Sequence, residues 1–160
     1  MSVAFTREDS AQTAQELALP ARPISPHPNL VTETGWRALE AAVADARAAL
    51  EAAHQIEDRD ERRRASELAL RDLSYFSERL ASAQVRPAPV DVGAVAFGGQ
   101  VTIRRDDGRR QTFRIVGEDE AEPGKDSISY VSPLARALIG KAVGDVAMMG
   151  GREIEILAIA

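Results

Sequence analysis

Four carboxylates within five residues are the part of this sequence with the clearest capacity for chemistry. They lie in the segment Glu57-Asp58-Arg59-Asp60-Glu61. Carboxylates held close together repel one another, and that repulsion favours a bound cation. Their oxygens suit Mg²⁺, which typically takes only one or two protein carboxylates and keeps several waters. Such a pair could lend ligands to a metal held mainly by another protein, where a second metal activates water for phosphodiester hydrolysis. The alternative is a solvated charge cluster at a helix turn, which is what most charge runs are.

Arginines form two further charged groups. Arg62, Arg63 and Arg64 directly follow the acidic segment, and we expect them to pair with it, although guanidinium groups also bind phosphate. A second set surrounds a predicted turn at Gly108; it comprises Arg104, Arg105, Arg109, Arg110 and Arg114. Strand alternation places Arg104, Arg110 and Arg114 on one side of two strands. There they could contact RNA or an acidic partner, or simply form a solubilised outer face.

The composition excludes several other chemistries. The 160 residues include no cysteine, which excludes disulfides, thiolate metal sites and cysteine nucleophiles. The two histidines, His27 and His54, are isolated and do not make a catalytic triad or a metal cluster. A net charge of −5 is unlike that of a free DNA-binding protein, so a chain that works near nucleic acid would dock on a protein. With no apolar segment typical of a signal peptide or membrane helix, a cytoplasmic protein is expected.

Two helices with matching apolar spacing are predicted to hold the acidic segment between them. Small and apolar residues recur three and four apart in each arm, at Trp36, Leu39, Val43, Ala46, Leu50 and Ala53, and again at Ser66, Ala69, Leu73, Phe76, Leu80 and Ala83. This is the spacing of a coiled-coil seam. Thr32 or Thr34 can cap the first helix, and Pro87 ends the second. We therefore predict an antiparallel coiled-coil hairpin over residues 32–85 that turns near 57–62; the alternative is two helices folded on a separate core.

The residues before the hairpin form a proline-rich N-terminal extension. Residues 1–31 carry Pro20, Pro23, Pro26 and Pro28 in polar sequence, which favours extended or flexible chain. A strap packed on the rest of the protein is the alternative. The expected oligomeric state is a monomer, because the apolar seam of the hairpin can be satisfied within one chain.

Residues 90–160 change to a period of two, which predicts strands. Asp106-Asp107-Gly108 fits a hairpin turn, and Gly150-Gly151 fits another. A strand is expected over Ser127–Val131. A short helix then follows between Ser132 as N-cap, Pro133 at the first helical position and Gly140 as the C-terminal stop. The fold class is α+β, with a small, mostly antiparallel sheet carrying one short helix.

Motifs in this last segment resemble the C-terminal domain of the Gre factors, GreA and GreB. They are Val95-Ala96-Phe97-Gly98, the run Thr112–Glu120, and the run Ser129–Lys141 continued by Val143-Gly144-Asp145-Val146. The stretch from Ser132 to Asp145 is the most specific. The resemblance extends weakly to residues 31–35 and 83–85, at the two ends of the predicted hairpin, and does not cover residues 1–30.

The resemblance implies an FKBP-like C-terminal domain that docks on RNA polymerase, and a coiled coil that enters the secondary channel of the enzyme. The residues implied in docking are Ser132, Pro133, Arg136 and Lys141. The tip pair of the family has the form Asp-x-x-Glu, which maps onto Asp58 and Glu61. These two residues would share a Mg²⁺ with the polymerase, which then cleaves backtracked RNA, so the factor is not itself an enzyme. Contact with RNA and DNA would be indirect, and fold alone implies no prolyl isomerase activity.

Two departures from the family pattern bear on this activity. Arg62-Arg63-Arg64-Ala65 stands where the family usually continues with Asn-Ala-Glu-Tyr. The stretch from Gly35 to Val85 is also shorter than the family hairpin by about 14 residues, which shortens each arm by roughly 10 Å. One alternative is therefore a non-cleaving regulator of the same channel, nearer to the Rnk-like relatives with short hairpins. Another is a coiled-coil module that binds a different helical protein.

Overall fold

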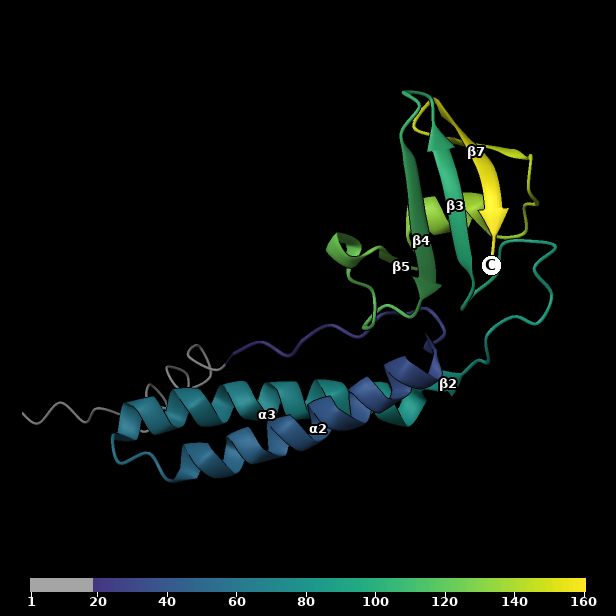
Figure 1. Ribbon diagram of the computed structural model, residues 1–160. Coiled ribbons are helices and arrows are strands. Elements are labelled where there is room, and N and C mark those ends of the chain that lie inside the picture. The colour runs from purple at the N-terminus through teal and green to yellow at the C-terminus, as the bar shows by residue number, and fades with distance from the viewer. Residues whose placement is uncertain (1–18) are drawn as a thin grey trace, which may run out of the picture. The chain divides into compact units, whose positions relative to one another are not determined.

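The computed structural model describes residues 19–160 (Figure 1). These residues form two compact units. One unit contains residues 25–40 and 79–160, and the described part of the other contains residues 19–24 and 41–78. Among the described residues, no helix has the length and apolar character needed to cross a membrane.

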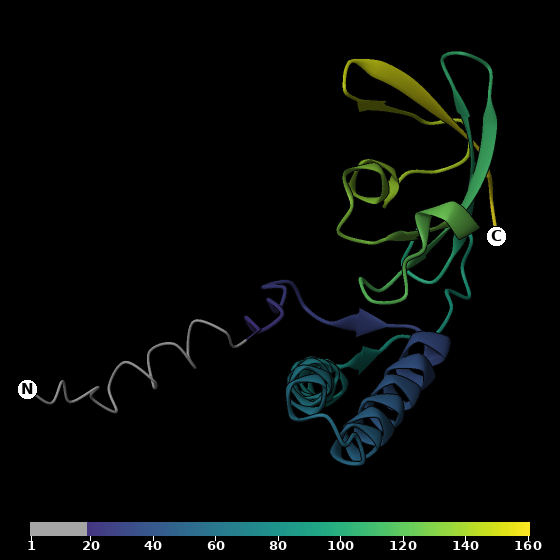
Figure 2. The same cartoon turned by 90° about the vertical axis from the view of Figure 1, so that its left-hand side faces the viewer.

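A helical hairpin is built from α2 (Glu33–His54) and α3 (Arg59–Ser82). The two helices lie side by side and are joined by a short turn, as Figures 1 and 2 show. The predicted seam is present, and its most buried members are Leu39, Val43, Ala46, Ala53 and Ala69. The turn comes slightly earlier than predicted, because α3 already begins at Arg59.

The start and end of the hairpin are joined by a pair of very short strands. β1 (Leu30–Val31) pairs in parallel with β2 (Gln84–Val85). Thr32 is the residue that caps α2, since its Oγ1 accepts a hydrogen bond from the backbone N–H of Gly35 at 3.0 Å. This resolves the choice between Thr32 and Thr34.

The second sheet has five strands in the order β5-β4-β3-β7-β6. Their bounds are β3 Gln100–Arg105, β4 Arg110–Val116, β5 Ser127–Ser129, β6 Val146–Met149 and β7 Arg152–Ile159. The pairing is antiparallel except between β4 and β5, which run parallel. A short 3₁₀ helix, η1 (Pro123–Lys125), precedes β5. The strand expected over Ser127–Val131 ends at Ser129, because the chain turns toward the next helix.

Helix α4 (Pro133–Leu138) covers one face of this sheet, and the core lies between them (Figure 2). Ile103, Ile115, Leu138 and Ile156 are completely buried there. The predicted α+β class, the hairpin and the small sheet with one short helix are confirmed.

The helix cap and the turns in this domain form at the residues that the sequence predicted. The Ser132 hydroxyl accepts a hydrogen bond from the N–H of Ala135 at 3.2 Å, which caps α4, and Gly140 has a φ of +86° beyond the end of the helix. Gly108 has a φ of +81° in the turn between β3 and β4, a conformation that glycine adopts without strain.

Candidate functional site

The acidic tip begins with Asp58, which is the N-cap of α3. Its Oδ1 accepts a hydrogen bond from the N–H of Glu61 at 2.8 Å, and its carbonyl accepts one from the N–H of Arg62 at 2.9 Å. Both Asp58 and Glu61 are exposed. An acid at the cap followed three residues later by glutamate is the spacing of a capping box. The Asp-x-x-Glu spacing therefore has a structural reason of its own, in addition to any chemistry.

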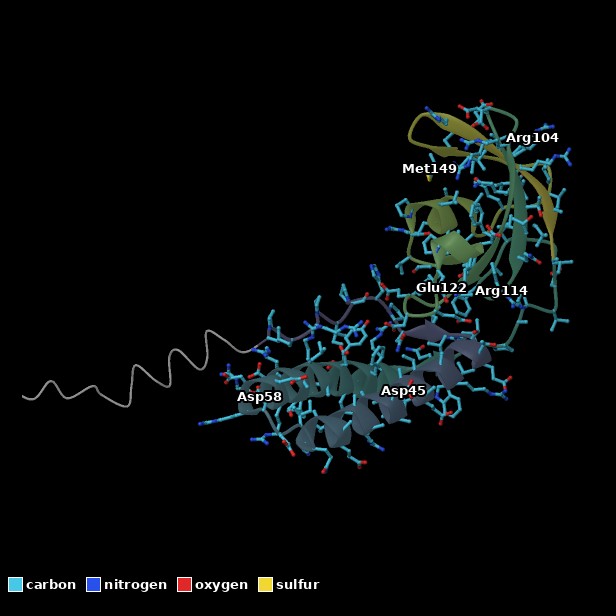
Figure 3. All side chains as sticks on the ribbon, turned by 60° about the vertical axis from the view of Figure 1, so that its left-hand side comes forward. Asp45, Asp58, Arg104, Arg114, Glu122 and Met149 are labelled. Atoms are coloured by element: carbon cyan, nitrogen blue, oxygen red, sulfur yellow. The ribbon has the colours of Figure 1, made fainter. Side chains whose placement is uncertain are left out.

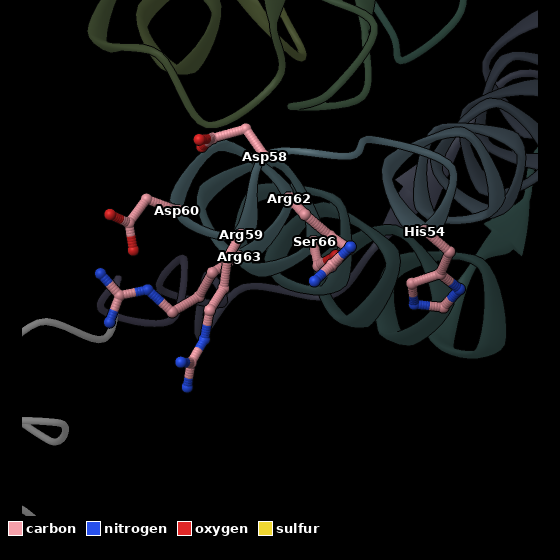
Figure 4. Close-up of a pocket in the computed structure, with 7 residues that line it drawn as sticks. All are labelled: His54, Asp58, Arg59, Asp60, Arg62, Arg63 and Ser66. Atoms are coloured by element: carbon pink, nitrogen blue, oxygen red, sulfur yellow. The ribbon is translucent and has the colours of Figure 1, made fainter.

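The other tip acids do not converge with this pair. Figure 4 shows the carboxylates of Asp58 and Asp60 pointing in different directions. Within the part of the chain that the structure describes, no group of three or more acids, histidines or cysteines could hold a metal ion alone. Asp58 and Glu61 can supply at most part of a coordination shell. They fit a shared Mg²⁺ chemically, because Asp58 keeps a second carboxylate oxygen beyond its capping bond and hard cations prefer such oxygens.

The arginines at the tip do not neutralise these acids as predicted. In residues 19–160 no ion pair joins Arg62, Arg63 or Arg64 to the acidic segment, and Arg62 instead donates to the carbonyl of Ile56 at 2.9 Å. Arg59 and Arg63 lie four residues apart on α3 and extend to the same side (Figure 4). Asp58 instead uses a carboxylate oxygen to cap the α3 backbone, and the predicted self-pairing is wrong.

The base of the hairpin holds a buried ionic group that the sequence did not reveal. Arg79 of α3 is 1% exposed. Its Nε lies 2.5 Å from Oδ2 of Asp119, and its second terminal nitrogen lies 3.7 Å from Glu118. Its carbonyl accepts a bond from the Asn29 amide at 2.6 Å. The sequence carried no signal for it, because Arg79 stands next to the seam position Leu80 and its carboxylate partners lie far along the chain.

Two glycines allow close contacts in the same unit. Thr32, the cap of α2, donates to the Glu120 carboxylate at 2.7 Å, and Gly35 leaves room for that carboxylate. A Cβ added at Gly117 would lie 2.4 Å from the carbonyl oxygen of Leu30. The run from Gly117 to Glu120, singled out only as part of the resemblance, therefore fixes the start of the hairpin to this domain.

The described end of the N-terminal extension also makes specific contacts. In one unit, the Arg22 guanidinium lies 3.9 Å from the ring centroid of Tyr75 and 3.2 Å from the carboxylate of Asp72, both on α3. In the other unit, the Tyr130 hydroxyl donates to the carbonyl of Pro28. Burial, reinforced by the Glu118 carboxylate, raises the pKa of the Tyr130 phenol, so the donated proton is retained. Flexibility of residues 1–18 stays a prediction, because they lie outside the described residues.

The predicted docking residues divide into exposed and structural ones. Pro133 and Arg136 are exposed on α4, whereas the Ser132 hydroxyl is used as the helix cap and Lys141 is half-buried. A hollow beside the helix is lined by His27, Tyr130, Val131, Arg136 and Ile139. The exposed side of α4 therefore offers one cation beside an apolar side chain, an arrangement suited to a protein partner.

Comparison with known proteins agrees with the resemblance seen in the sequence. The family model of the transcription elongation factor GreA/GreB C-terminal domain matches residues 90–160. Transcription elongation factor GreA of Ralstonia nicotianae is 44% identical over 91 residues, which cover 52% of this chain and 58% of that relative. Transcription elongation factor GreB of Pasteurella multocida is 35% identical over 133 residues, covering 73% of this chain and 84% of the relative.

A solved structure, the prokaryotic transcription elongation factor GreA/GreB from Nitrosomonas europaea, is 16% identical with a TM-score of 0.40, over 84% of this chain and 98% of that one. A likeness at this level supports no inference about function. The helical hairpin, the small sheet and the sequence matches together define a hairpin protein with a Gre-type C-terminal domain. The chain belongs to the GreA/GreB family of transcription elongation factors.

Proposed function

We propose that this chain binds RNA polymerase, inserts its hairpin into the secondary channel and stimulates the polymerase to cleave backtracked RNA. The observation that supports this most is the exposed Asp58 and Glu61 pair at the hairpin tip of a chain that belongs to the family. The factor would have no catalytic activity of its own. Its contact with RNA and DNA would be indirect and would occur only within the elongation complex.

In this proposal Asp58 and Glu61 share a Mg²⁺ with the polymerase, and a metal in that position activates water for phosphodiester cleavage. The part played by the chain is positional. Capping by Asp58 fixes the first turn of α3, so the two carboxylates are held on the same turn without a further contact. Docking would use the exposed side of α4, where Arg136 supplies a cation beside Ile139.

A second candidate, a regulator of the same channel that does not stimulate cleavage, is favoured by the length of the hairpin. α2 has 22 residues and therefore extends only about 33 Å. The unpaired arginines beside the tip acids also differ from a purely acidic tip.

The deciding experiment is transcript cleavage in a backtracked elongation complex with labelled RNA and Mg²⁺. The best variant is Asp58→Asn with Glu61→Gln, because asparagine still caps a helix and glutamine still suits the third position. Both changes remove charge while the tip keeps its fold. The matched control is Glu57→Gln with Asp60→Asn, which removes the same charge from neighbouring positions outside the pair.

Faster cleavage that is lost in the Asp58/Glu61 variant and kept in the control would establish the cleavage role. Binding to polymerase without any acceleration, measured in the same sample, would establish the regulator instead. Absence of binding would exclude both and leave an interaction module with another helical partner.

A further inference from the structure

The outward face of the five-stranded sheet carries arginines that the proposed activity at the tip does not use. Helix α4 covers the other face. Arg104 of β3 lies directly opposite Arg110 of β4, and Arg114 follows Arg110 on the same side of its strand. All three side chains are exposed. Figure 3 labels Arg104 and Arg114 at opposite ends of these strands, so the charges extend along the whole face.

The placement of these arginines opposes the stability of the sheet. Like charges directly opposite one another on neighbouring strands are destabilising. Arg104 is partly relieved by an ion pair with Glu155 of β7. Arg110 has no ion pair among the described residues. A like-charged pair that is compensated on one strand only is a local conflict, and such conflicts are expected at functional surfaces.

The charges form a row along the strands, with hydroxyl groups between them. Arg110 and Arg114 stand four residues apart on β4, a span of about 13 Å in an extended strand. Between them lies Thr112, whose hydroxyl shares a 2.9 Å hydrogen bond with Thr102. Beyond Arg114 the row continues to Arg86, because Arg114 and Arg86 line one hollow, which the carboxylate-bearing Glu33 at the start of α2 also lines. We name Arg104, Arg110, Arg114 and Arg86 the basic track.

We propose that the basic track binds the phosphate backbone of duplex DNA. Guanidinium groups match phosphate geometry well, and hydroxyls between them offer further hydrogen bonds. The outward-facing residues of β3 and β4 contain no aromatic side chain; they are Gln100, Thr102, Arg104, Arg110, Thr112 and Arg114. Single strands are held largely by stacking on aromatic rings, so this face suits a duplex and not single-stranded RNA. The arginines lie in a line, and the phosphates of a duplex are also spaced along a line. Acidic side chains scattered over a protein surface would match this row less well.

The binding has a defined character. It is independent of base sequence, because contacts to phosphate carry no sequence information. It is weak and sensitive to salt, since the whole chain carries a net charge of −5 and Glu153 and Glu155 border the row. Held at the polymerase, the chain would need little intrinsic affinity, because tethering raises the effective concentration of DNA.

The test is fluorescence anisotropy of the full chain with labelled duplexes of two unrelated sequences. Salt is varied between about 20 and 200 mM, because the slope of log K against log salt counts the phosphates neutralised. The variant is Arg110→Gln with Arg114→Gln. The matched control is Arg59→Gln with Arg63→Gln, which removes the same charge at the hairpin tip.

We expect the Arg110/Arg114 variant to lower the steepness of this slope by about 2 and to weaken binding roughly tenfold at the lowest salt, because each phosphate contact contributes about 0.9 to the slope. The tip control should bind like the unmodified chain, and the two sequences should bind equally.

Several outcomes would overturn the proposal. They are no binding at the lowest salt, an equal loss in both variants, or tighter binding of single-stranded RNA of the same length. Normal DNA binding by the variant, together with loss of binding to purified polymerase, would assign the row to an acidic protein surface. Because the assay contains no polymerase in its first arm, its result does not depend on the cleavage activity.

Discussion

Charged residues have opposite surroundings at the base and at the tip of the hairpin. At the base, Arg79 is almost completely buried and its guanidinium lies beside two carboxylates, Asp119 and Glu118. At the tip, Asp58 and Glu61 are exposed, and the bonds to Asp58 come from the first turn of its own helix. Charges at the base are therefore used within the fold, while charges at the tip are available for a partner.

The largest loss of stability should follow removal of the buried cation at the base. Arg79→Ala removes the buried guanidinium that Asp119 and Glu118 contact. Because these two side chains are 16% and 22% exposed, we expect a loss of about 3 kcal/mol of unfolding free energy, at the lower end of the range for a buried pair. Urea denaturation followed by circular dichroism measures it. Arg63→Ala at the exposed tip serves as the control and should stay within about 0.5 kcal/mol of the unmodified chain. Equal losses in both variants would contradict the contrast between base and tip.

A second way to test the base is to fill a close contact with one methyl group. Gly117→Ala places its Cβ 2.4 Å from the Leu30 carbonyl oxygen, so the backbone must shift, at a cost of about 1–3 kcal/mol. Gly124→Ala is the matched control, because nothing lies within 4 Å of the new Cβ there. Thermal unfolding of both variants compares them. A Gly117→Ala protein as stable as the control would show that β1 is not held tightly against this loop.

At the tip the effect is smaller and depends on the replacement. Asp58→Ala removes the cap of α3 and should cost about 1 kcal/mol, whereas Asp58→Asn should cost only a fraction of that because asparagine caps equally well. Denaturant midpoints of the two variants measure the difference. If both variants lose the same stability, the charge of Asp58 matters more than its capping bond.

The smallest expected effect is a pH dependence at the turn between β3 and β4. The backbone N–H of Arg109, followed by its guanidinium, lowers the pKa of Asp107. A lowered pKa in the folded state gives stability that is present above the unfolded pKa and is lost as the pH falls through the folded value. Asp107→Asn should therefore flatten the stability profile in the acidic range only. An NMR titration of the carboxyl group gives the direction of the shift independently.

Local features of this fold were predictable from the sequence, and long-range ones were not. The cap at Ser132, the turn at Gly108 and the seam through Val43 depend on residues within a few positions of one another, so spacing and residue type were sufficient. The burial of Arg79 depends on carboxylates that lie 39 and 40 positions along the chain. No periodicity connects such positions, and the parallel pairing of β4 with β5 was missed for the same reason.

The candidate site shows the same limit. The acidic segment could be found from residue type alone, whereas the choice of Asp58 and Glu61 within it came from the Asp-x-x-Glu pattern of the family that the sequence resembles. The failure of Arg62, Arg63 and Arg64 to pair with the acids could not be foreseen, because residue spacing does not say that Asp58 caps the helix or that Arg62 bonds to the Ile56 carbonyl. The basic track was only partly visible, since Arg86 lies in a different segment from β3 and β4 and only the fold brings it to the hollow beside Arg114.

The parallel pair β1 and β2 places the first and last residues of the hairpin next to each other, with Leu30 beside Gln84 and Val31 beside Val85. A segment whose two ends lie side by side can be replaced by a longer or shorter one. The points at which the chain leaves and re-enters the C-terminal domain stay the same whatever the length of the segment. Adding seven residues to each arm would keep the heptad phase and lengthen the probe by roughly 10 Å. Reach is therefore a property that evolution or an engineer can adjust independently of the domain that carries the hairpin.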